Sequence, residues 1–310
     1  MNWPVSMRQT VVSSKWRCSR GKLEASLAPL FELMELLGVV LAVWYGGFSL
    51  DDHETLPSHG AKRLPGGALD VIVEGVSFQY PRSTRQVLRE VSFTVQLGET
   101  IALVGRNGAG KSTLLPTEGS ILVRGVDLRQ WDLDAWRGIV GAMPQDVFLF
   151  QATIAENIAY GCLEASRAEI EKAAHESGVE QLVQRFLHGL ETMMGERGAT
   201  LSGGARQLIA LARLFLRKPR LLLLDEPTAH LDGEALYQVG IALKRLMAGR
   251  TTFLIAHRPE TIQPADRILL LDRSRLLATG THEALLVQSV LYRKLLAEMD
   301  HTSLEVHKAD

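Results

Sequence analysis

Thr100-Ile-Ala-Leu-Val-Gly-Arg-Asn-Gly-Ala-Gly-Lys-Ser-Thr113 is the stretch of this sequence that decides the fold. Its apolar first half predicts a buried strand, and residues 112–115 are compatible with the start of a helix. Between them lie the four positions that fit the phosphate-binding pattern G-x-x-x-x-G-K-[S/T]: Gly105, Gly110, Lys111 and Ser112. In such a loop, backbone N–H groups and the lysine ammonium contact phosphate oxygens, and the serine hydroxyl can bind Mg²⁺. The strand, loop and helix therefore predict a site for nucleotide phosphates.

The composition narrows the function classes. A chain of 310 residues allows about two domains. The chain has 34 basic and 35 acidic residues, so its overall charge gives no reason to expect nucleic acid or an anionic membrane surface as a partner. The two cysteines, Cys18 and Cys162, are far apart, which excludes a disulfide framework and a cysteine-rich zinc site. The first 22 residues lack the apolar core of a signal peptide.

An apolar segment precedes the α/β pattern. Residues 36–50 carry no charge, and extension back to Leu27 reaches the length of about 20 residues that a spanning helix needs. That extension takes in Glu32 and Glu35, so a buried or interfacial helix is the alternative to a span. Basic residues near the N-terminus argue that this end stays inside, and one crossing would then place the rest of the chain outside. We therefore favour a membrane-associated segment that does not span.

Downstream of residue 69, the pattern alternates between strands and helices. The expected strands lie near residues 71–80, 91–95, 100–104, 120–124, 139–143, 221–224, 251–255 and 267–271. The expected helices lie near residues 166–175, 179–187, 205–217, 234–248 and 288–298. This alternation predicts a parallel sheet covered by helices.

Two carboxylates follow the apolar run at residues 221–224. Ligands bind at the carboxyl ends of parallel strands, so Asp225 is placed to hold Mg²⁺ through a water molecule. Glu226 lies one residue further on, where it could polarise an attacking water. A surface loop after a core strand would show the same residues.

Other candidates are ambiguous when taken singly. Ser202, Gly203 and Gly204 open a helix and could form a second anion site, although a capped helix start looks the same. Gln145, His257 and Tyr80 each follow or end a predicted strand and would ordinarily be structural residues.

The order of these elements resembles the nucleotide-binding domain of an ABC transporter. The resemblance implies a P-loop NTPase of the ABC ATPase type, an α/β fold with a RecA-like core, an antiparallel β subdomain and a helical subdomain, preceded by a short apolar helical segment. It divides the chain into a remnant of a transmembrane domain at residues 1–50 with one apolar helix near 27–50, a linker at 51–69, the ATP-binding domain at 70–300 and a polar tail at 301–310.

The resemblance also implies a role for each candidate residue. Tyr80 would stack on adenine, Gln145 would contact both Mg²⁺ and the transport domain, and His257 would be the switch histidine. Asp225 would hold Mg²⁺ together with Ser112 and Gln145, and Glu226 would be the catalytic base. The remaining nucleotide contacts would come from the phosphate loop, from the signature, which serves the other subunit, and from the D-loop: Gly105, Asn107, Gly108, Gly110, Lys111, Ser112, Thr113, Ser202, Gly203, Gly204 and Asp232.

Two segments are similar to those of exporters. Gly195-Glu-Arg-Gly198 looks like the loop that meets the transmembrane coupling helices. Leu27–Gly47, which includes Trp44-Tyr-Gly-Gly47, resembles a late spanning helix of an exporter's membrane domain, so the chain looks like the C-terminal half of a fused exporter. The implied cofactors are ATP and Mg²⁺. The implied partners are a second ABC ATP-binding domain, identical or different, and an exporter transmembrane domain, with no nucleic acid. The implied location is the cell membrane, with the ATP-binding domain on the cytoplasmic side.

The sequence departs from this family in three places. After Phe48, on the order of 50 residues are absent, including a span of about 20. The helix that begins at Lys111 meets Pro116, which shortens it by about two turns or roughly 8 residues. Ala205 replaces the usual signature glutamine, and Met193 replaces an acidic residue.

Three functions remain open from the sequence. The first is an ATP-binding and hydrolysing exporter subunit, which couples ATP-driven dimerisation to transport. The second is an internally deleted exporter remnant that is catalytically weak or inactive. The third is a soluble ABC ATPase that acts on nucleic acid or ribosomes, against which the near-neutral charge and the exporter-like segments argue.

Overall fold

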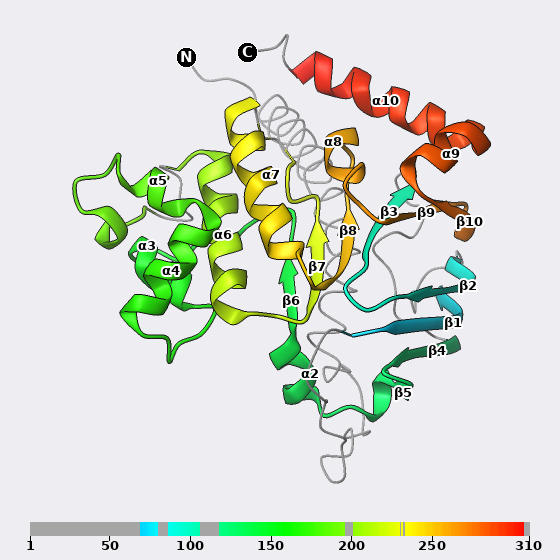
Figure 1. The fold of residues 1–310 in the computed structure, drawn as a ribbon, viewed down its shortest axis with the longest axis horizontal. Coiled ribbons are helices and arrows are strands. Elements are labelled where there is room, and N and C mark those ends of the chain that lie inside the picture. Colours follow the sequence, from blue (N-terminus) through cyan, green and yellow to red (C-terminus); the bar gives the residue numbers. More distant parts are fainter. Residues whose placement is uncertain are drawn as a thin grey trace, which may run out of the picture.

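The structure is a computed structural model, and it describes residues 69–79, 86–105, 118–195, 201–229, 231 and 233–306. In these residues, three layers form the molecule: an antiparallel sheet, a mainly parallel sheet and a group of helices (Figure 1). The apolar segment near residues 27–50, the linker and the last four residues of the tail lie outside the described residues. No helix in the described part combines the length and the apolar character that a membrane crossing requires.

The mainly parallel sheet is the centre of the fold. Its strand order is β10-β9-β3-β8-β7-β6, and β10 alone runs antiparallel to its neighbour. The strands are β3 (Thr100–Gly105), β6 (Val140–Met143), β7 (Leu221–Asp225), β8 (Thr251–Ile255), β9 (Arg267–Asp272) and β10 (Arg275–Gly280). Runs such as TIALVG and LLLLD lack the alternation of a one-sided strand because both faces of a parallel sheet are covered.

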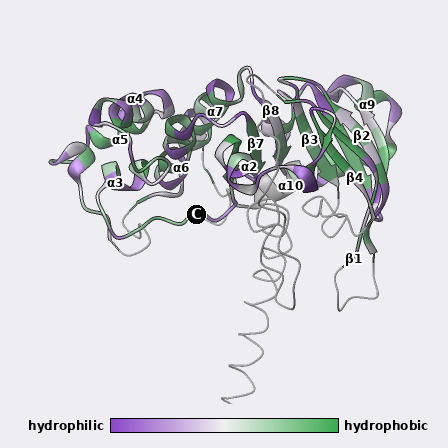
Figure 2. Cartoon of the chain, turned by 90° about the horizontal axis from the view of Figure 1, so that it is seen from below, coloured by the Kyte–Doolittle hydropathy of each residue, from purple (hydrophilic) through white to green (hydrophobic). Residues whose placement is uncertain are grey.

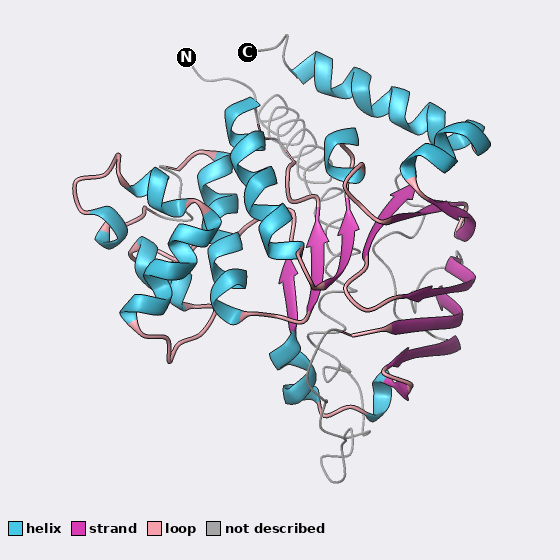
Figure 3. Cartoon of the chain, viewed as in Figure 1, coloured by secondary structure: helices cyan, strands magenta, loops and turns pink. Residues whose placement is uncertain are grey.

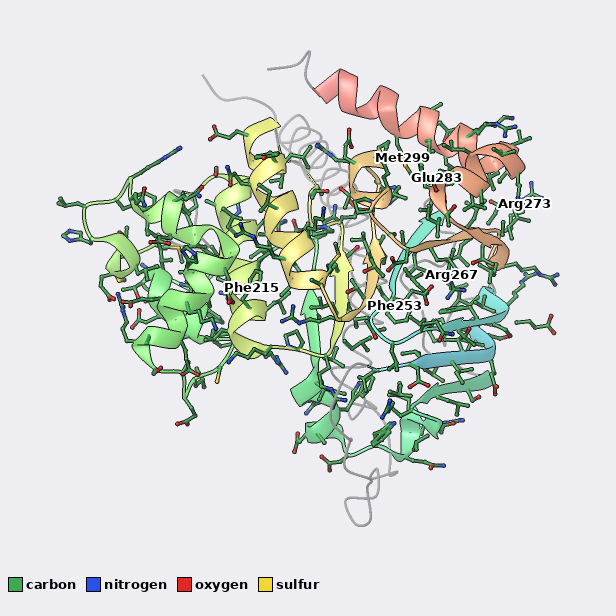
Figure 4. All side chains as sticks on the ribbon, viewed as in Figure 1. Phe215, Phe253, Arg267, Arg273, Glu283 and Met299 are labelled. Carbon is green, nitrogen blue, oxygen red and sulfur yellow. The ribbon has the colours of Figure 1, made fainter. Side chains whose placement is uncertain are left out.

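The second sheet is antiparallel, with the order β2-β1-β4-β5. Its strands are β1 (Val71–Gln79), β2 (Gln86–Val95), β4 (Glu118–Val123) and β5 (Val126–Asp127). It packs against one face of the parallel sheet, where the ring of Phe93 lies 6.4 Å from that of Phe253. Arg267 of β9 joins the sheets by donating from Nε to Glu99 Oε1 at 2.7 Å and from Nη2 to the carbonyl of Thr94; Figure 4 labels Phe253 and Arg267.

Most of the helices pack on the other side of the parallel sheet, whereas α2 contributes Trp136 to the core shared with the antiparallel sheet (Figure 3). The longer ones are α4 (Arg167–Ser177), α6 (Gly203–Arg217), α7 (Gly233–Met247) and α10 (Val290–Val306). The short ones are α2 (Leu133–Ile139), α3 (Ile154–Ala159), α5 (Val179–Val183), α8 (Pro259–Ile262) and α9 (His282–Gln288), with single 3₁₀ turns at η1 (Leu128–Gln130) and η2 (Gly189–Glu191). In Figure 2 the strands around β3 and β4 carry mostly hydrophobic colour, whereas the outer helices α4 and α5 carry both colours.

Strand β3 separates two hydrophobic cores. Ile101 and Leu103 pack with the antiparallel sheet, and Ala102 and Val104 pack with the helices, as the two-residue period of a strand requires. All four side chains are at most 4% exposed. The strand that precedes the phosphate-binding pattern is therefore fixed on both faces up to its carboxyl end.

The expected fold class is confirmed, and most expected elements are present, with corrections at their ends. The helix expected near residues 179–187 ends at Val183, because the amides of Arg185 and Phe186 bond to carbonyls three residues back and tighten the chain into turns. The strand expected near 91–95 begins at Gln86, on the far side of an irregularity at Glu90, whose φ is +48°. The elements that the sequence did not predict are β5, β10, α2, α3, α8 and α9.

Candidate functional site

The carboxyl ends of three parallel strands meet at one edge of the sheet. Asp225, the last residue of β7, pairs in register with Ile255 of β8, and Ile255 pairs with Leu103 of β3. Gly105, where the phosphate-binding pattern begins, therefore leaves the sheet two residues beyond this row. Any phosphate held by that loop lies at the same edge as the residues that follow β7 and β8.

Glu226 lies at the centre of this edge. Its φ of +42° is in the left-handed region, which is uncommon for a residue other than glycine. The backbone around it is held by two hydrogen bonds of 2.9 Å, from the Glu226 amide to the carbonyl of Ile255 and from the amide of Ala229 to the Glu226 carbonyl. Such strained residues cluster at functional sites when the surrounding structure fixes them.

Two polar side chains contact the Glu226 carboxylate. Gln145 donates from Nε2 to Oε2 at 3.2 Å, and His257 Nε2 lies 3.0 Å from Oε1. The side chains of Glu226 and His257 are 22% and 31% exposed, so solvent water reaches the pair. The residues come from the ends of β7, β6 and β8, and the structure thus brings together three of the sequence-predicted site residues. The arrangement can accept a proton from water and orient the carboxylate that takes it.

Asp225 immediately precedes Glu226 in the chain and is 3% exposed. The carboxylate of Asp225 and the amide of Gln145, which lie at or just after the ends of the neighbouring strands β7 and β6, offer the oxygen ligands that Mg²⁺ prefers. Within the described residues no three His, Cys, Asp or Glu side chains form a metal cluster.

Gln145 is anchored by helix α6. Its backbone carbonyl accepts a hydrogen bond of 3.4 Å from Nε2 of Gln207, a side chain that is 6% exposed. Buried hydroxyls of Thr228 and Thr261, 2.8 Å apart, join the turn after Glu226 to α8. Sequence reasoning missed Gln207, Thr228 and Thr261. The signal in the chain was a polar residue inside an apolar helix and a threonine two residues after Glu226.

The segment expected to form a second anion site begins helix α6. Ser202 is the N-cap, and its Oγ accepts from the amide of Ala205 at 3.2 Å. Gly203 and Gly204 form the first turn, whose remaining amides carry the positive end of the dipole of a 15-residue helix. Gly204 lies against α7, where an added Cβ would come within 2.6 Å of the Ala235 Cβ.

We expect Gly204→Ala to destabilise the domain by about 1–3 kcal/mol, because the added methyl group must push α6 away from α7. The matched control is Gly240→Ala in the interior of α7, where a Cβ meets nothing within 4 Å. That change should stabilise the chain by about 0.5–1 kcal/mol through helix propensity. Urea unfolding measures both. A Gly204→Ala variant as stable as the parent would show that this helix contact is not tight.

The other sequence-predicted site residues lie outside the described residues. They are Tyr80, Asn107, Gly108, Gly110, Lys111, Ser112, Thr113 and Asp232.

Comparisons with known proteins identify the family to which the chain is similar. Residues 88–229 match the family model described as ABC transporter. The ATP-dependent lipid A-core flippase of Pseudomonas fluorescens (strain Pf0-1) is 45% identical over 240 residues, which cover 74% of this chain and 40% of that protein. The mitochondrial potassium channel ATP-binding subunit of Xenopus tropicalis is 40% identical over 261 residues, which cover 81% of this chain and 38% of that protein.

A solved structure agrees with these relatives. The structure of a bacterial Atm1-family ABC exporter with ATP bound matches with a TM-score of 0.72 and 38% identity, over 78% of this chain and 44% of that one. The chain thus spans about two fifths of the length of the curated relatives it matches, 40% and 38% for the two above. It belongs to the ABC transporter family and carries that family's nucleotide-binding ATPase domain.

Proposed function

We propose that this chain is the ATP-binding and ATP-hydrolysing subunit of an ABC exporter, in which ATP-driven dimerisation is coupled to transport across a membrane. The observation that carries the proposal is the Glu226 carboxylate, held between Gln145 and His257 at the edge where β3 leads into the phosphate-binding pattern. The exporter likeness of the relatives supports the direction of transport. The two relatives above are named after different molecules, lipid A-core and potassium, so their names do not identify the substrate that this chain would transport.

In the proposed mechanism, Glu226 is the general base. It takes a proton from a water molecule while the water oxygen attacks the γ-phosphorus of ATP, the bond to the β-phosphate oxygen breaks, and ADP leaves. Gln145 and His257 contact different oxygens of the Glu226 carboxylate, which is partly exposed, so water can approach the base. His257 and Gln145 then orient the base. Residues 105–113 would hold the phosphates, and Tyr80 would stack on the adenine.

Asp225, Gln145 and Ser112 are the residues proposed to hold Mg²⁺. When bound, the ion supplies positive charge to the phosphate oxygens. Asp225 ends β7 at the edge of the sheet where β3 leads into the phosphate-binding pattern, and this position supports its part in this set.

A second ABC ATP-binding domain, identical or different, is the first proposed partner. Ser202, Gly203 and Gly204 lie at the start of α6, where backbone amides face outward from the helix end. We infer that they contact the γ-phosphate held by the partner, and that Asp232 contributes to the same interface.

An exporter transmembrane domain is the second proposed partner. The segment after Gln145 exposes an aromatic surface formed by Phe148, Phe150 and Tyr160, which are 54%, 37% and 54% exposed. Exposed aromatic groups of this kind mark protein contacts. The surface continues the chain from Gln145, so a partner docked on it is linked to the site. A chain docked in this way would be associated with the membrane, and we propose that its ATP-binding domain lies on the cytoplasmic side. We propose no nucleic-acid partner.

A second candidate function rests on the connection between β3 and β4. Only residues 106–117 lie between Gly105 and Glu118, so the phosphate loop and the helix after it must fit into this length. A helix as short as the sequence predicts there would favour an internally deleted exporter remnant that is catalytically weak or inactive.

The purified full chain tests the proposal by the release of phosphate from MgATP. Turnover that rises with the square of enzyme concentration at high dilution, and that Glu226→Gln removes, is the expected result for a dimer-dependent ATPase. ATP binding without turnover would favour the weak remnant instead. A salt-sensitive shift of DNA or RNA would indicate the nucleic-acid alternative.

We expect the shortened helix to limit the activity of the chain. A helix of five residues, 111–115, would cover about 7.5 Å at 1.5 Å rise, so we expect it to supply little of the packing that should hold the phosphate loop. Insertion of an amphipathic helix of about two turns, roughly 8 residues, between Leu115 and Pro116 should raise both the melting temperature and the affinity for ATP. Calorimetry with the parent and with an inserted Gly/Ser segment of equal length as control measures this. If the parent already binds ATP at micromolar Kd and the helix adds nothing, the short helix is harmless.

A further inference from the structure

The guanidinium of Arg213 ties helix α6 to the segment that carries the aromatic surface. Its Nη1 donates to the carbonyl of Phe148 at 2.7 Å, its Nε donates to the carbonyl of Asn157 at 2.8 Å, and its Nη2 donates to Asn157 Oδ1 at 2.8 Å. All three nitrogens are used, and every acceptor belongs to residues 148–157. Burial lowers the pKa of Arg213 to about 10, so the side chain remains charged at neutral pH.

The side chain of Asn157 holds the same segment, residues 148–157, through its own hydrogen bonds. It is 1% exposed. Its Oδ1 accepts from the amide of Phe150 at 2.9 Å, while its Nδ2 donates to the carbonyls of Phe150 and Thr153, each at 3.0 Å. Asn157 thus pairs both backbone groups of Phe150, as a neighbouring strand would. Because residues 144–152 form no helix or strand, these side-chain bonds help to fix this part of the chain, together with the bond from Gln207 to the carbonyl of Gln145.

The aromatic rings close over the guanidinium. Arg213 Cζ lies 5.9 Å from the ring centroid of Phe150 and 5.7 Å from that of Tyr160. The two rings are 4.5 Å apart, and the ring of Phe148 lies 5.1 Å from that of Phe150. These distances are within the range of cation–π contact. The rings of Phe150 and Tyr160 therefore contact the positively charged guanidinium of Arg213, which belongs to α6.

We propose that Arg213 and Asn157 are positioning residues that make the aromatic surface and helix α6 one rigid unit, so that movement of Ser202–Gly204 at the other end of α6 is passed to the exporter transmembrane domain proposed to dock on that surface. The part that concerns docking rests on the proposed function. A helix of 15 residues is about 22 Å long, and it moves as a rod. Without the three bonds of Arg213, the bond from Gln207 to Gln145 and packing would still join this part of the chain to α6, but residues 148–157 could lag behind the helix.

The first experiment measures amide hydrogen exchange in the full chain without nucleotide. Arg213→Met keeps the stem and removes the donors. We expect the Phe150 amide to exchange at least tenfold faster relative to amides inside α6. Arg213→Lys retains one ammonium and should give a smaller rise, of about threefold or more, and it decides the question if the methionine variant does not fold.

Arg217→Met is the matched control, because Arg217 also lies on α6 and is partly buried but donates to the carbonyl of Arg137 instead. In this variant, the exchange rate of the Phe150 amide relative to amides inside α6 should stay within twofold of the parent value. Equal acceleration at Phe150 and α6 would mean that Arg213 adds only global stability, which overturns the proposal.

The second experiment adds saturating MgATP. In the parent, exchange should change both at residues 202–205 and at residues 148–153. In Arg213→Lys the change at residues 202–205 should remain, whereas the change at residues 148–153 should fall at least threefold. Persistence of both changes would overturn the proposal, since a purely structural residue would leave the response intact. If the parent responds at neither place, the proposed ATP function fails, while the nucleotide-free comparison still decides the role of Arg213.

Discussion

Replacement of Lys111 with alanine is expected to abolish measurable ATP binding by the full chain. The substitution removes the only ammonium of the phosphate-binding pattern at residues 105–113, which would contact the outer phosphates. A hydrogen bond to a charged group contributes about 1.5–3 kcal/mol, and the ammonium can form more than one. Two such bonds lost together would weaken binding by a factor of at least about 100.

Isothermal calorimetry with MgATP measures this loss directly. The control is Lys172→Ala, which removes the same charge from the outer side of α4, where the ammonium lies 3.8 Å from Glu176. This control should bind ATP as the parent does. A Lys111→Ala variant with the parent's affinity would show that nucleotide does not bind through residues 105–113.

Replacement of Glu226 with glutamine should stop turnover while ATP remains bound. The change keeps the size of the side chain and an oxygen that can accept from Gln145 or lie beside His257, but an amide cannot take a proton from water. Loss of a general base slows catalysis by about 10²–10⁴-fold. Because ATP would then persist between two signature-containing subunits, the variant should accumulate as an ATP-dependent dimer.

Phosphate release and light scattering after gel filtration, with and without ATP, follow the two effects separately. Glu164→Gln, which alters an exposed carboxylate before α4, serves as the control and should behave as the parent. Turnover of the Glu226→Gln variant at the parent rate would exclude Glu226 as the base. Parent activity that stays linear in enzyme concentration where the chain is monomeric would contradict the need for a dimer.

Long, strongly patterned elements could be predicted from the sequence, whereas short ones could not. Strands β3 and β7 are almost wholly apolar, and α6 is amphipathic over its whole length, so their patterns are unambiguous. Helix α3 has six residues, too few to show a helical period. Its capping box, in which Thr153 and Glu156 each bond the other's backbone amide, was the signal that could have found it. The amide of Thr153 also lowers the pKa of Glu156.

The candidate site divides in the same way. The order of the motifs identified the family and predicted a role for each candidate residue. The contacts among Gln145, Glu226 and His257 could not be read from that order, because Gln145 and Glu226 are 81 positions apart. Which oxygen faces which partner depends on the left-handed backbone of Glu226, and this in turn depends on the amide bond to Ile255 in a neighbouring strand.

The sequence by itself thus determined the alternation of strands and helices and the phosphate-binding pattern, because apolar period and glycine placement are local properties of the chain. The order of its motifs carried the resemblance to the family and to that family's fold. Only the tertiary structure decided how the site is assembled. Parallel pairing brings the carboxyl ends of β3, β7 and β8 into one row, and no local pattern encodes that register. The link from Arg213 to Asn157 has the same origin: its partners lie 56 positions apart and meet only because α6 packs on α3.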